Sequence, residues 1–207
     1  MPPRATVRMV VSVIRLTAFQ TPDPQLGDDV VALRPWRDGD VPAKIAAFTD
    51  PEIQRFSWPL AEPYTVADAW AQHLEHVRAW EAGTAAEFAC TEPAGDRALI
   101  GGASVYDIEP VPRRASIGYW VAAHARGRGV ARHAVSLLAT WAFDELGIAR
   151  LQITCGPDNV ASQRVAERCG FTREAVLRSH FPFKGSRRDT VVFSLLPGEL
   201  RRPGASH

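Results

Sequence analysis

A strand, a glycine-rich loop and a helix start follow one another within residues 117–146, and this succession most constrains what the chain can fold into. Residues 117–121 form an apolar, β-like run, and Arg126-Gly127-Arg128-Gly129-Val130-Ala131 follows it. Apolar residues then recur at helical spacing until Gly147. Glycines let an anion approach the backbone, and the first N–H groups and the dipole of a helix favour phosphate. The segment therefore predicts a phosphate-binding loop.

An ordinary turn with solvated arginines is the alternative interpretation of this segment. Two familiar phosphate motifs do not fit it. A dinucleotide-binding fingerprint GxGxxG that starts at Gly127 requires glycine where Arg132 stands. A Walker A loop is not formed either, because Lys184-Gly185-Ser186 lacks the preceding glycine spacing.

Two blocks of the sequence resemble a known family. Arg126-x-x-Gly129-x-Ala131 resembles the Q/R-x-x-G-x-G/A pyrophosphate loop of the GNAT superfamily of acyl-CoA-dependent N-acetyltransferases. Asn159-x-x-Ser162-x-x-Val165-x-Glu167-x-x-Gly170-Phe171 resembles the later block of that superfamily, in its ribosomal-protein-alanine N-acetyltransferase-like (RimJ/RimL-type) form. The blocks stand in the family's order, with helix and strand patterns between them.

The resemblance implies an α+β fold: a mixed, mostly antiparallel central sheet of about seven strands, flanked by helices and splayed at the acyl-CoA site. We expect a single N-acetyltransferase domain over residues 29–197, an N-terminal extension or linker over residues 1–28 and a C-terminal tail over residues 198–207. Local patterns predict a capped helix from Thr65, an antiparallel meander over residues 86–122 and two last strands over residues 171–177 and 190–196. A hairpin turn is expected at residues 185–189.

The resemblance also implies acetyl-CoA as the acyl-donor cosubstrate. In the family, the backbone of the strand before the loop pairs with pantetheine, and the loop binds the pyrophosphate. The residues that would bind acetyl-CoA here are Trp120, Val121, Arg126, Gly127, Arg128, Gly129, Val130, Ala131, Asn159 and Ser162. In similar enzymes the Asn orients pantetheine, and the Ser hydroxyl protonates the departing thiolate. The structural alternative is that Asn159 or Asp158 only caps a helix and that Ser162 lies on the surface.

The general base is the open point of this interpretation. Similar proteins often carry Glu where Ser116 stands, just before Ile-Gly-Tyr. Others use a Glu late in the segment after the second block, and that stretch here contains His180 but no carboxylate. His180 titrates in the useful range and is our catalytic candidate beside Ser162, with Asp107 and Glu109 as further candidates near strand ends. A mechanism without a single protein base also stays open.

The acceptor would bind in the N-terminal half, where family members build the substrate groove. Trp36, Trp58 and Tyr64 are the candidate substrate-binding residues there, although such aromatics also serve as core. His73 and His76 are helical neighbours without a third ligand, so no metal is expected.

Charge and cysteine content exclude several classes of protein. The chain has 207 residues, with 24 Lys plus Arg against 23 Asp plus Glu and no polybasic run, which argues against nucleic-acid and membrane-surface binding. No apolar run reaches about 18 residues, so no transmembrane helix is expected. Arg15 interrupts the apolar residues 9–16, which do not make a convincing signal peptide. The 3 cysteines fit neither a disulfide framework nor a CxxC spacing, which favours the cytoplasm.

The sequence therefore predicts an acetyl-CoA-dependent N-acetyltransferase. It would move an acetyl group to a primary amine, either a protein N-terminus or a small molecule, by direct attack in a ternary complex. Whether the chain forms a homodimer stays open at this point. The alternatives are a non-catalytic acyl-CoA-binding or sensing domain and a transferase for a larger acyl group.

Overall fold

A seven-stranded sheet forms the centre of the computed structural model, which describes residues 20, 22, 25–57, 64–93 and 98–204. The strand order is β1-β2-β3-β4-β5-β7-β6. All neighbours are antiparallel except β4 and β5, which are parallel. The prediction of a mixed, mostly antiparallel sheet is confirmed. The strands are β1 (Ala32–Pro35), β2 (Ala86–Thr91), β3 (Leu99–Glu109), β4 (Arg114–Val121), β5 (Arg150–Cys155), β6 (Thr172–Phe183) and β7 (Ser186–Leu195).

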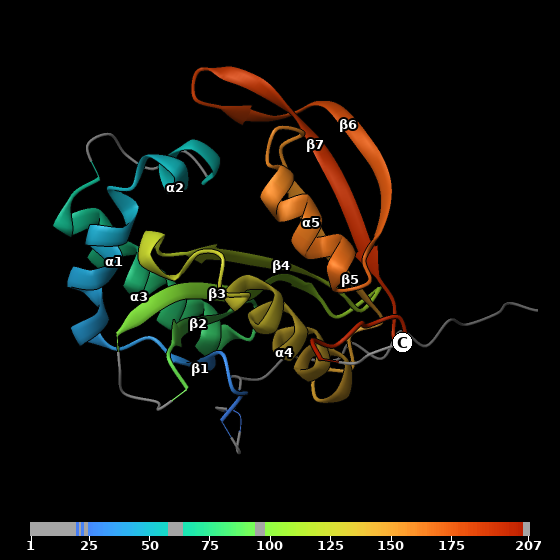
Figure 1. Ribbon diagram of the computed structural model, residues 1–207, viewed down its shortest axis with the longest axis horizontal. Helices are drawn as coiled ribbons and strands as arrows, with labels where there is room; N and C mark the ends of the chain where they lie inside the picture. Colours follow the sequence, from blue (N-terminus) through green and yellow to red (C-terminus); the bar gives the residue numbers. More distant parts are fainter. Residues whose placement is uncertain (1–19, 21, 23–24, 58–63, 94–97, 205–207) are drawn as a thin grey trace, which may run out of the picture.

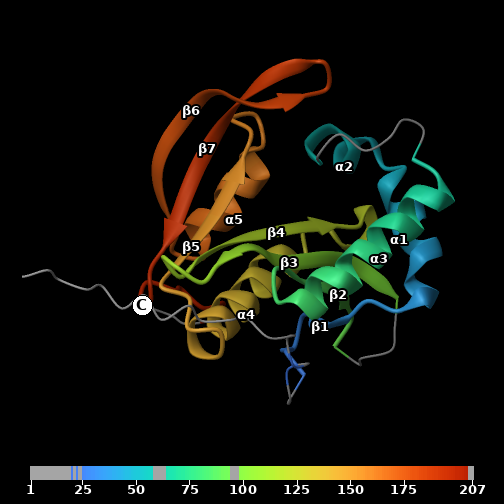
Figure 2. The ribbon, with the colours of Figure 1, turned by 180° about the vertical axis from the view of Figure 1, so that it is seen from behind.

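Helices cover both faces of the β1–β4 part of the sheet (Figures 1 and 2). One face carries α3, which packs against β2 and α1, and the other carries α4, which packs against β3 and β4. α5 lies beside α4 and β5. The helices are η1 (Asp38–Asp40), α1 (Val41–Phe48), α2 (Pro51–Phe56), α3 (Val66–Ala82), η2 (Ala123–Ala125), α4 (Val130–Asp144) and α5 (Val160–Arg168).

The hydrophobic core lies between the sheet and α4. Inward-facing strand residues such as Phe88 and Ile117 meet Leu138 of α4, and all three are buried. The rings of Phe88 and Trp141 meet edge to face with centroids 5.6 Å apart. Because α4 buries its whole inner face here, its N-terminus is held at the end of β4.

The predicted helix from Thr65 begins with a capping box. The Thr65 hydroxyl accepts a hydrogen bond from the backbone N–H of Asp68 at 3.2 Å, and the Asp68 carboxylate accepts one from the backbone N–H of Thr65 at 2.8 Å. Apolar residues recur at helical spacing along α3, which indicates a buried stripe, but Trp70 is 38% exposed and Leu74 51%. α3 instead buries Ala69 and the imidazole of His73.

Two local expectations from the sequence are wrong. Pro51 should interrupt regular structure, because proline breaks a helix interior, yet it starts α2. Proline suits the first position of a helix because its missing N–H has no helical partner there, and the Asp50 carboxylate caps α2. The last two strands also run further than expected, so that Ser186 and Arg187 lie in β7 and the turn falls at Lys184 and Gly185.

The extended β6 and β7 form an arm that rises from the sheet beside α5 (Figure 1). Cross-strand pairs continue to Phe183 and Ser186, next to the turn. The Arg187 guanidinium donates to the Ser179 carbonyl at 2.7 Å, which fixes the irregular part of β6. The arm stands opposite α2, and residues of both elements line one pocket.

A buried ion pair holds the connection between β1 and α1. The Arg34 guanidinium donates to both carboxylate oxygens of Asp40, at 2.7 and 2.8 Å, and the backbone N–H of Arg37 donates to Asp40 at 2.8 Å. Burial alone would raise the pKa of Asp40, but the hydrogen bonds from Arg34 and Arg37 outweigh it and hold that pKa below its ordinary value. Among the described residues, no helix combines the length and apolar character needed to cross a membrane.

We expect Asp40→Asn to lower the free energy of unfolding by about 3 kcal/mol, because it leaves the buried Arg34 without its counter-charge. Since the pKa of Asp40 is depressed on folding, its contribution is present above the ordinary carboxyl pKa and is lost as the pH falls through the depressed value. Urea unfolding of the wild type and the variant at neutral and acidic pH measures both effects. Asp144→Asn, at an exposed position, is the matched control and should stay within about 0.5 kcal/mol. An Asp40→Asn variant as stable as this control contradicts the prediction.

Candidate functional site

β4 and β5 separate along most of their length. They pair only over three residue pairs, from Arg114 with Arg150 to Ser116 with Gln152. From Ile117 onward, β3 is the one strand that pairs with β4 in the part of the chain that the structure describes. The backbone groups of residues 117–121 on the other side are therefore free to pair with an extended ligand. We call this opening the β4–β5 split.

A loop with two left-handed glycines follows β4 and leads into α4. Gly127 has φ +75° and Gly129 has φ +83°, and Gly129 is the N-cap of α4. Side chains rarely tolerate this conformation, which accounts for glycine at both positions. The N–H groups of the first turn of a helix have no helical acceptors, and here they lie beside exposed glycine backbone. The loop has the geometry of an anion site.

The two arginines of the loop are held in ion pairs. The Arg126 guanidinium contacts Glu52 at 2.9 Å and also Asp50, the N-cap of α2. Hydrogen bonding from Arg126 is the main cause of the lowered pKa of Asp50. Arg128 contacts Glu92 at 3.3 Å on the surface. The arginines thus connect the loop to α2 and to the end of β2, and the backbone N–H groups of the loop are the candidate anion site.

His133, which the sequence analysis did not select, stands over the same loop. A Cβ at Gly129 would lie 3.4 Å from the His133 ring, and the Nδ1 of that ring lies 2.8 Å from the Asp28 carboxylate. The sequence signal that could have identified His133 is its position in the first turn of the helix after the glycine loop. The hydrogen bonds that Asp28 accepts from Val30 and Val31 tie the chain before β1 to this loop.

Asn159 and Ser162 meet at the start of α5, as their spacing predicts. The Asn159 side chain accepts a hydrogen bond from the backbone N–H of Ser162 at 3.1 Å, so Asn159 caps the helix. The Ser162 hydroxyl lies 2.9 Å from the Tyr119 hydroxyl and also contacts the Cys155 thiol. Tyr119 is on β4 and Cys155 is on β5. Ser162 therefore bridges the two sides of the β4–β5 split, and Tyr119 is a second residue that the sequence analysis did not assign.

Burial raises the pKa of the Tyr119 hydroxyl, and its bond to Ser162 only partly opposes this. Tyr119 therefore stays protonated at neutral pH. A phenol and a serine hydroxyl in contact can pass a proton to a leaving group beside them. This pair is therefore the candidate proton donor of the site.

On the α3 face of the sheet, aromatic rings surround the end of β4. The Trp120 ring stacks on Trp36 with centroids 6.4 Å apart, and it meets Phe48 edge to face at 5.1 Å. Tyr64 stacks on Phe48 at 5.5 Å, and burial raises the pKa of its hydroxyl to about 12. Trp36 and Tyr64 thus lie in one aromatic group with Trp120, whereas Trp58 lies outside the described residues.

A pocket of about 530 Å³ opens between α2 and the β6–β7 arm. The Asp158 carboxylate connects the two sides of this pocket, because it accepts hydrogen bonds from Arg55 of α2 at 3.2 Å and from Arg188 of β7. The Arg188 guanidinium also packs over the Phe183 ring at 4.5 Å. Basic side chains outnumber the single acid in its lining, which is Pro51, Gln54, Arg55, Asp158, Phe183, Lys184, Ser186, Arg187 and Arg188.

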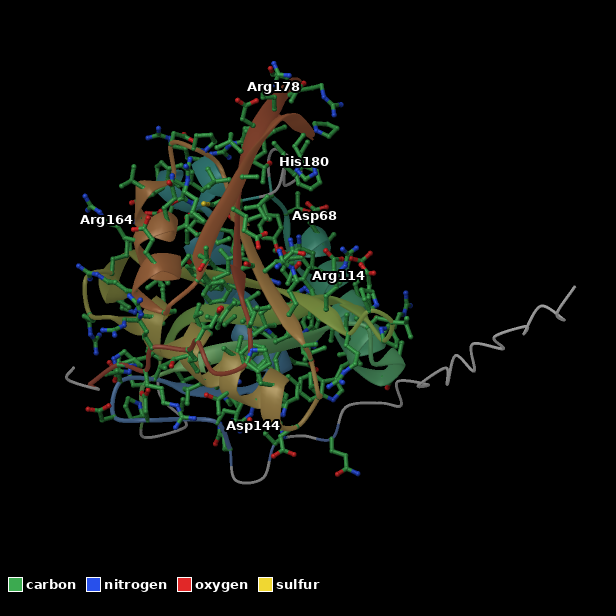
Figure 3. The ribbon with its side chains drawn as sticks, turned by 90° about the vertical axis from the view of Figure 1, so that its right-hand side faces the viewer. Asp68, Arg114, Asp144, Arg164, Arg178 and His180 are labelled. Atoms are coloured by element: carbon green, nitrogen blue, oxygen red, sulfur yellow. The ribbon has the colours of Figure 1, made fainter. Side chains whose placement is uncertain are left out.

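The three candidate bases from the sequence do not gather at the split. Figure 3 shows His180 on the β6–β7 arm near Arg178, and its ring packs on Phe181 with centroids 4.0 Å apart. Glu109 forms an exposed pair with Arg114 at 2.8 Å, at the opposite end of β4 from the glycine loop. Asp107 is exposed at an irregularity of β3. None of these contacts connects them to Ser162 or Tyr119.

Comparisons with known proteins agree with this geometry. A family model described as "Acetyltransferase (GNAT) domain" matches residues 31–172. YdaF of Bacillus subtilis (strain 168), whose name marks it provisionally as a ribosomal N-acetyltransferase, is 38% identical over 104 residues, covering 50% of this chain and 57% of YdaF. The ribosomal-protein-serine acetyltransferase of Escherichia coli (strain K12) is 36% identical over 80 residues, covering 39% of this chain and 45% of that relative. The chain thus matches about half the length of these relatives.

A solved structure from Vibrio cholerae, named provisionally as a ribosomal-protein-serine acetyltransferase, superposes with a TM-score of 0.74 and 26% identity. The superposition covers 86% of this chain and 100% of that one. The fold, the split strands and the glycine loop thus agree with a family model that matches more than half of the sequence. The chain belongs to the GNAT acetyltransferase-domain family.

Proposed function

We propose that the protein is an acetyl-CoA-dependent N-acetyltransferase that acts on a primary amine by direct attack in a ternary complex. The observation that carries this proposal is the alignment of the anion loop, the β4–β5 split and Ser162 along one path. Pyrophosphate would bind the backbone N–H groups at residues 126–131. Pantetheine would pair with the backbone of Trp120 and Val121, which brings the thioester to Ser162.

The chemistry follows from this placement. The amine nitrogen attacks the thioester carbon, and the C–S bond breaks as the C–N bond forms. The departing sulfur is then next to the Ser162 and Tyr119 hydroxyls, which supply its proton. We propose residues 29–197 as the domain that carries this activity. The free thiols of Cys90, Cys155 and Cys169 support a reducing compartment such as the cytoplasm.

The acceptor we propose is a protein N-terminus with acidic residues close behind it. The name of the Escherichia coli relative refers to a ribosomal protein and that of YdaF to the ribosome, which supports a protein acceptor. The pocket between α2 and the β6–β7 arm supports the charge preference, because all of its charged lining residues except Asp158 are basic. A peptide passing from this pocket to the split would place its terminal amine at the thioester.

Acetyl-CoA and desulfo-CoA should both raise the melting temperature, because they bind only the folded loop. Gly129→Val should abolish this shift, since the side chain would fill the space of the phosphate. Gly198→Val is the matched control: Gly198 also has a left-handed φ, of +90°, and a Cβ there meets no other atom within 4 Å. Differential scanning fluorimetry checks the prediction. An unchanged ligand shift in Gly129→Val would show that phosphate binds elsewhere.

Ser162→Ala should lower kcat by about 100-fold and leave the acetyl-CoA melting shift nearly unchanged, because it removes a proton donor and little binding. Tyr119→Phe should also lower kcat, because it removes the other hydroxyl of the pair. Thiol release with an amine peptide measures kcat, and Ser136→Ala, a buried serine of α4, is the control for loss of a hydroxyl. Full activity in Ser162→Ala would remove Ser162 from the mechanism. Acetyl-CoA binding without thiol release from any amine in the wild type would instead indicate a sensing domain.

Peptides with acidic residues after the terminal amine should show a lower KM than neutral peptides, and the difference should shrink as salt is added. Arg55→Gln combined with Lys184→Gln should raise the KM of the acidic peptide by about 5-fold with little change in kcat. Arg78→Gln, at an exposed position on α3, should change neither constant. Equal KM values for acidic and neutral peptides would refute the charge preference and leave the transferase proposal intact.

A further inference from the structure

Glu87 is a carboxyl group on β2 that the site described above does not use. Its partner across the strand pair is Ser104 of β3, and the partner of Ser104 is Gly118 of β4. Opposite residues of an antiparallel pair point to the same face of the sheet. These three residues therefore form a row from β2 to the edge of β4 that borders the split. The Glu87 carboxylate accepts a hydrogen bond from the Ser104 hydroxyl.

Glycine at position 118 lets the polar row reach the split. A Cβ there would lie 3.2 Å from the Ser104 hydroxyl and 3.1 Å from the Tyr106 ring, which is tighter than ordinary contact. Tyr106 also hydrogen bonds to Ser116 of β4 and to Thr154 of β5, so its side chain spans both strands. The charge on Glu87 contributes to raising the pKa of Tyr106, although burial is the larger cause. Glu87, Ser104 and Tyr106 thus form one polar group that extends to the split.

Titratable groups around Glu87 come from three elements. α1 contributes Lys44, which is buried and lies over the Trp36 ring at 5.2 Å. β3 contributes Tyr106, and behind Lys44 α3 contributes His76, whose neighbour is His73. Burial lowers the pKa of Lys44, and the charge of Glu87 opposes this.

Burial raises the pKa of Glu87 to about 7, against the opposing effects of Lys44 and Ser104. Burial and the charges of Lys44 and His73 lower the pKa of His76 to about 3. His76 is therefore neutral when Glu87 ionises.

The two faces of the sheet carry different proton chemistry. Ser162 and Tyr119 lie on the face that α4 and α5 cover, where Tyr119 pairs with Ala103 and belongs to the core side. Glu87 and Ser104 lie on the face of α1 and α3. A thioester in the split would have a proton donor on one side and a carboxylate on the other.

We propose that Glu87 is the general base of the acetyl transfer and takes the proton of the acceptor amine through the Ser104 hydroxyl or one water molecule. This inference rests on the proposed function. Glu87 removes one proton from the acceptor ammonium, and the freed nitrogen lone pair forms the C–N bond. The electron pair of the C–S bond leaves with sulfur. The nitrogen loses two protons in all: the first reaches solvent through Glu87, and the second restores the proton that the Ser162–Tyr119 pair has given to the sulfur.

The test is kcat/KM for one amine peptide across the neutral pH range, with the acetyl-CoA melting shift measured in parallel. In the wild type, kcat/KM should rise with pH along a limb whose apparent pKa is near that of Glu87, about 7, because the carboxylate is the active form. Glu87→Gln should lose this limb and about 100-fold in kcat, with an unchanged acetyl-CoA shift. Glu75→Gln, the same change at an exposed position of α3, should behave as the wild type.

Ser104→Ala keeps the carboxylate and removes the relay, so it tests the inference even where Glu87→Gln fails to fold. It should cost about 10-fold in kcat and move the limb to higher pH, because the hydrogen bond from Ser104 lowers the pKa of Glu87. A limb that survives in Glu87→Gln, or that disappears in His73→Gln or His180→Gln, overturns the inference and leaves the transferase proposal standing. Acetyl-CoA binding without thiol release in the wild type overturns the proposed function itself, and the inference with it.

Discussion

The separation of β4 from β5 is the constraint on which the rest of the site depends. The two strands are parallel and pair over only three residue pairs, so the sheet is continuous at one end of β4 and open at the other. Such an opening exposes backbone groups that would otherwise be paired within the sheet. The packing of α4 on β3 and β4 and the pairing of β7 with β5 keep each strand in place without its neighbour.

Each functional element is placed relative to that opening. The glycine loop ends β4 and starts α4, so the positive end of the helix lies at the end of the split. Ser162, at the start of α5, reaches across to Tyr119. α2 and the β6–β7 arm form the walls of the pocket, and Asp158 joins them through Arg55 and Arg188. A ligand in the split would therefore have an anion site along its path, and a peptide would approach between the two walls.

The polar interior of the α3 face is the feature that ordinary core packing does not explain. Lys44 and His73 are buried in that face, while Val66, Trp70, Leu74 and Val77 of α3 are exposed. Burying charged and polar groups costs free energy unless they are paired. α3 thus buries a polar side chain on this face and exposes several apolar ones, and the role that we infer for Glu87 would account for the polar interior.

The sequence by itself determined much of the local structure, including the glycine loop before α4. The capping box at Thr65, the glycines at 127 and 129 and the spacing of Asn159 and Ser162 act within a few residues of each other, so their patterns are readable without tertiary contacts. Pro51 shows that even local prediction has a limit. Proline breaks the interior of a helix but is favourable at the first helical position, where Pro51 stands in α2. The family resemblance supplied the order of elements and the expected number of strands.

Only the tertiary structure decided which distant residues meet. Tyr119 contacts Ser162 because α5 packs against α4 and β5, which brings its start to β4, although 43 positions separate the two residues. Arg126 reaches Asp50 and Glu52, and His133 reaches Asp28, through contacts between elements far apart in the chain. Glu87 has no distinguishing neighbour in the sequence. Its row with Ser104 and Gly118 exists because strand register sets which side chains share a face, and register is fixed by the packing of the whole sheet.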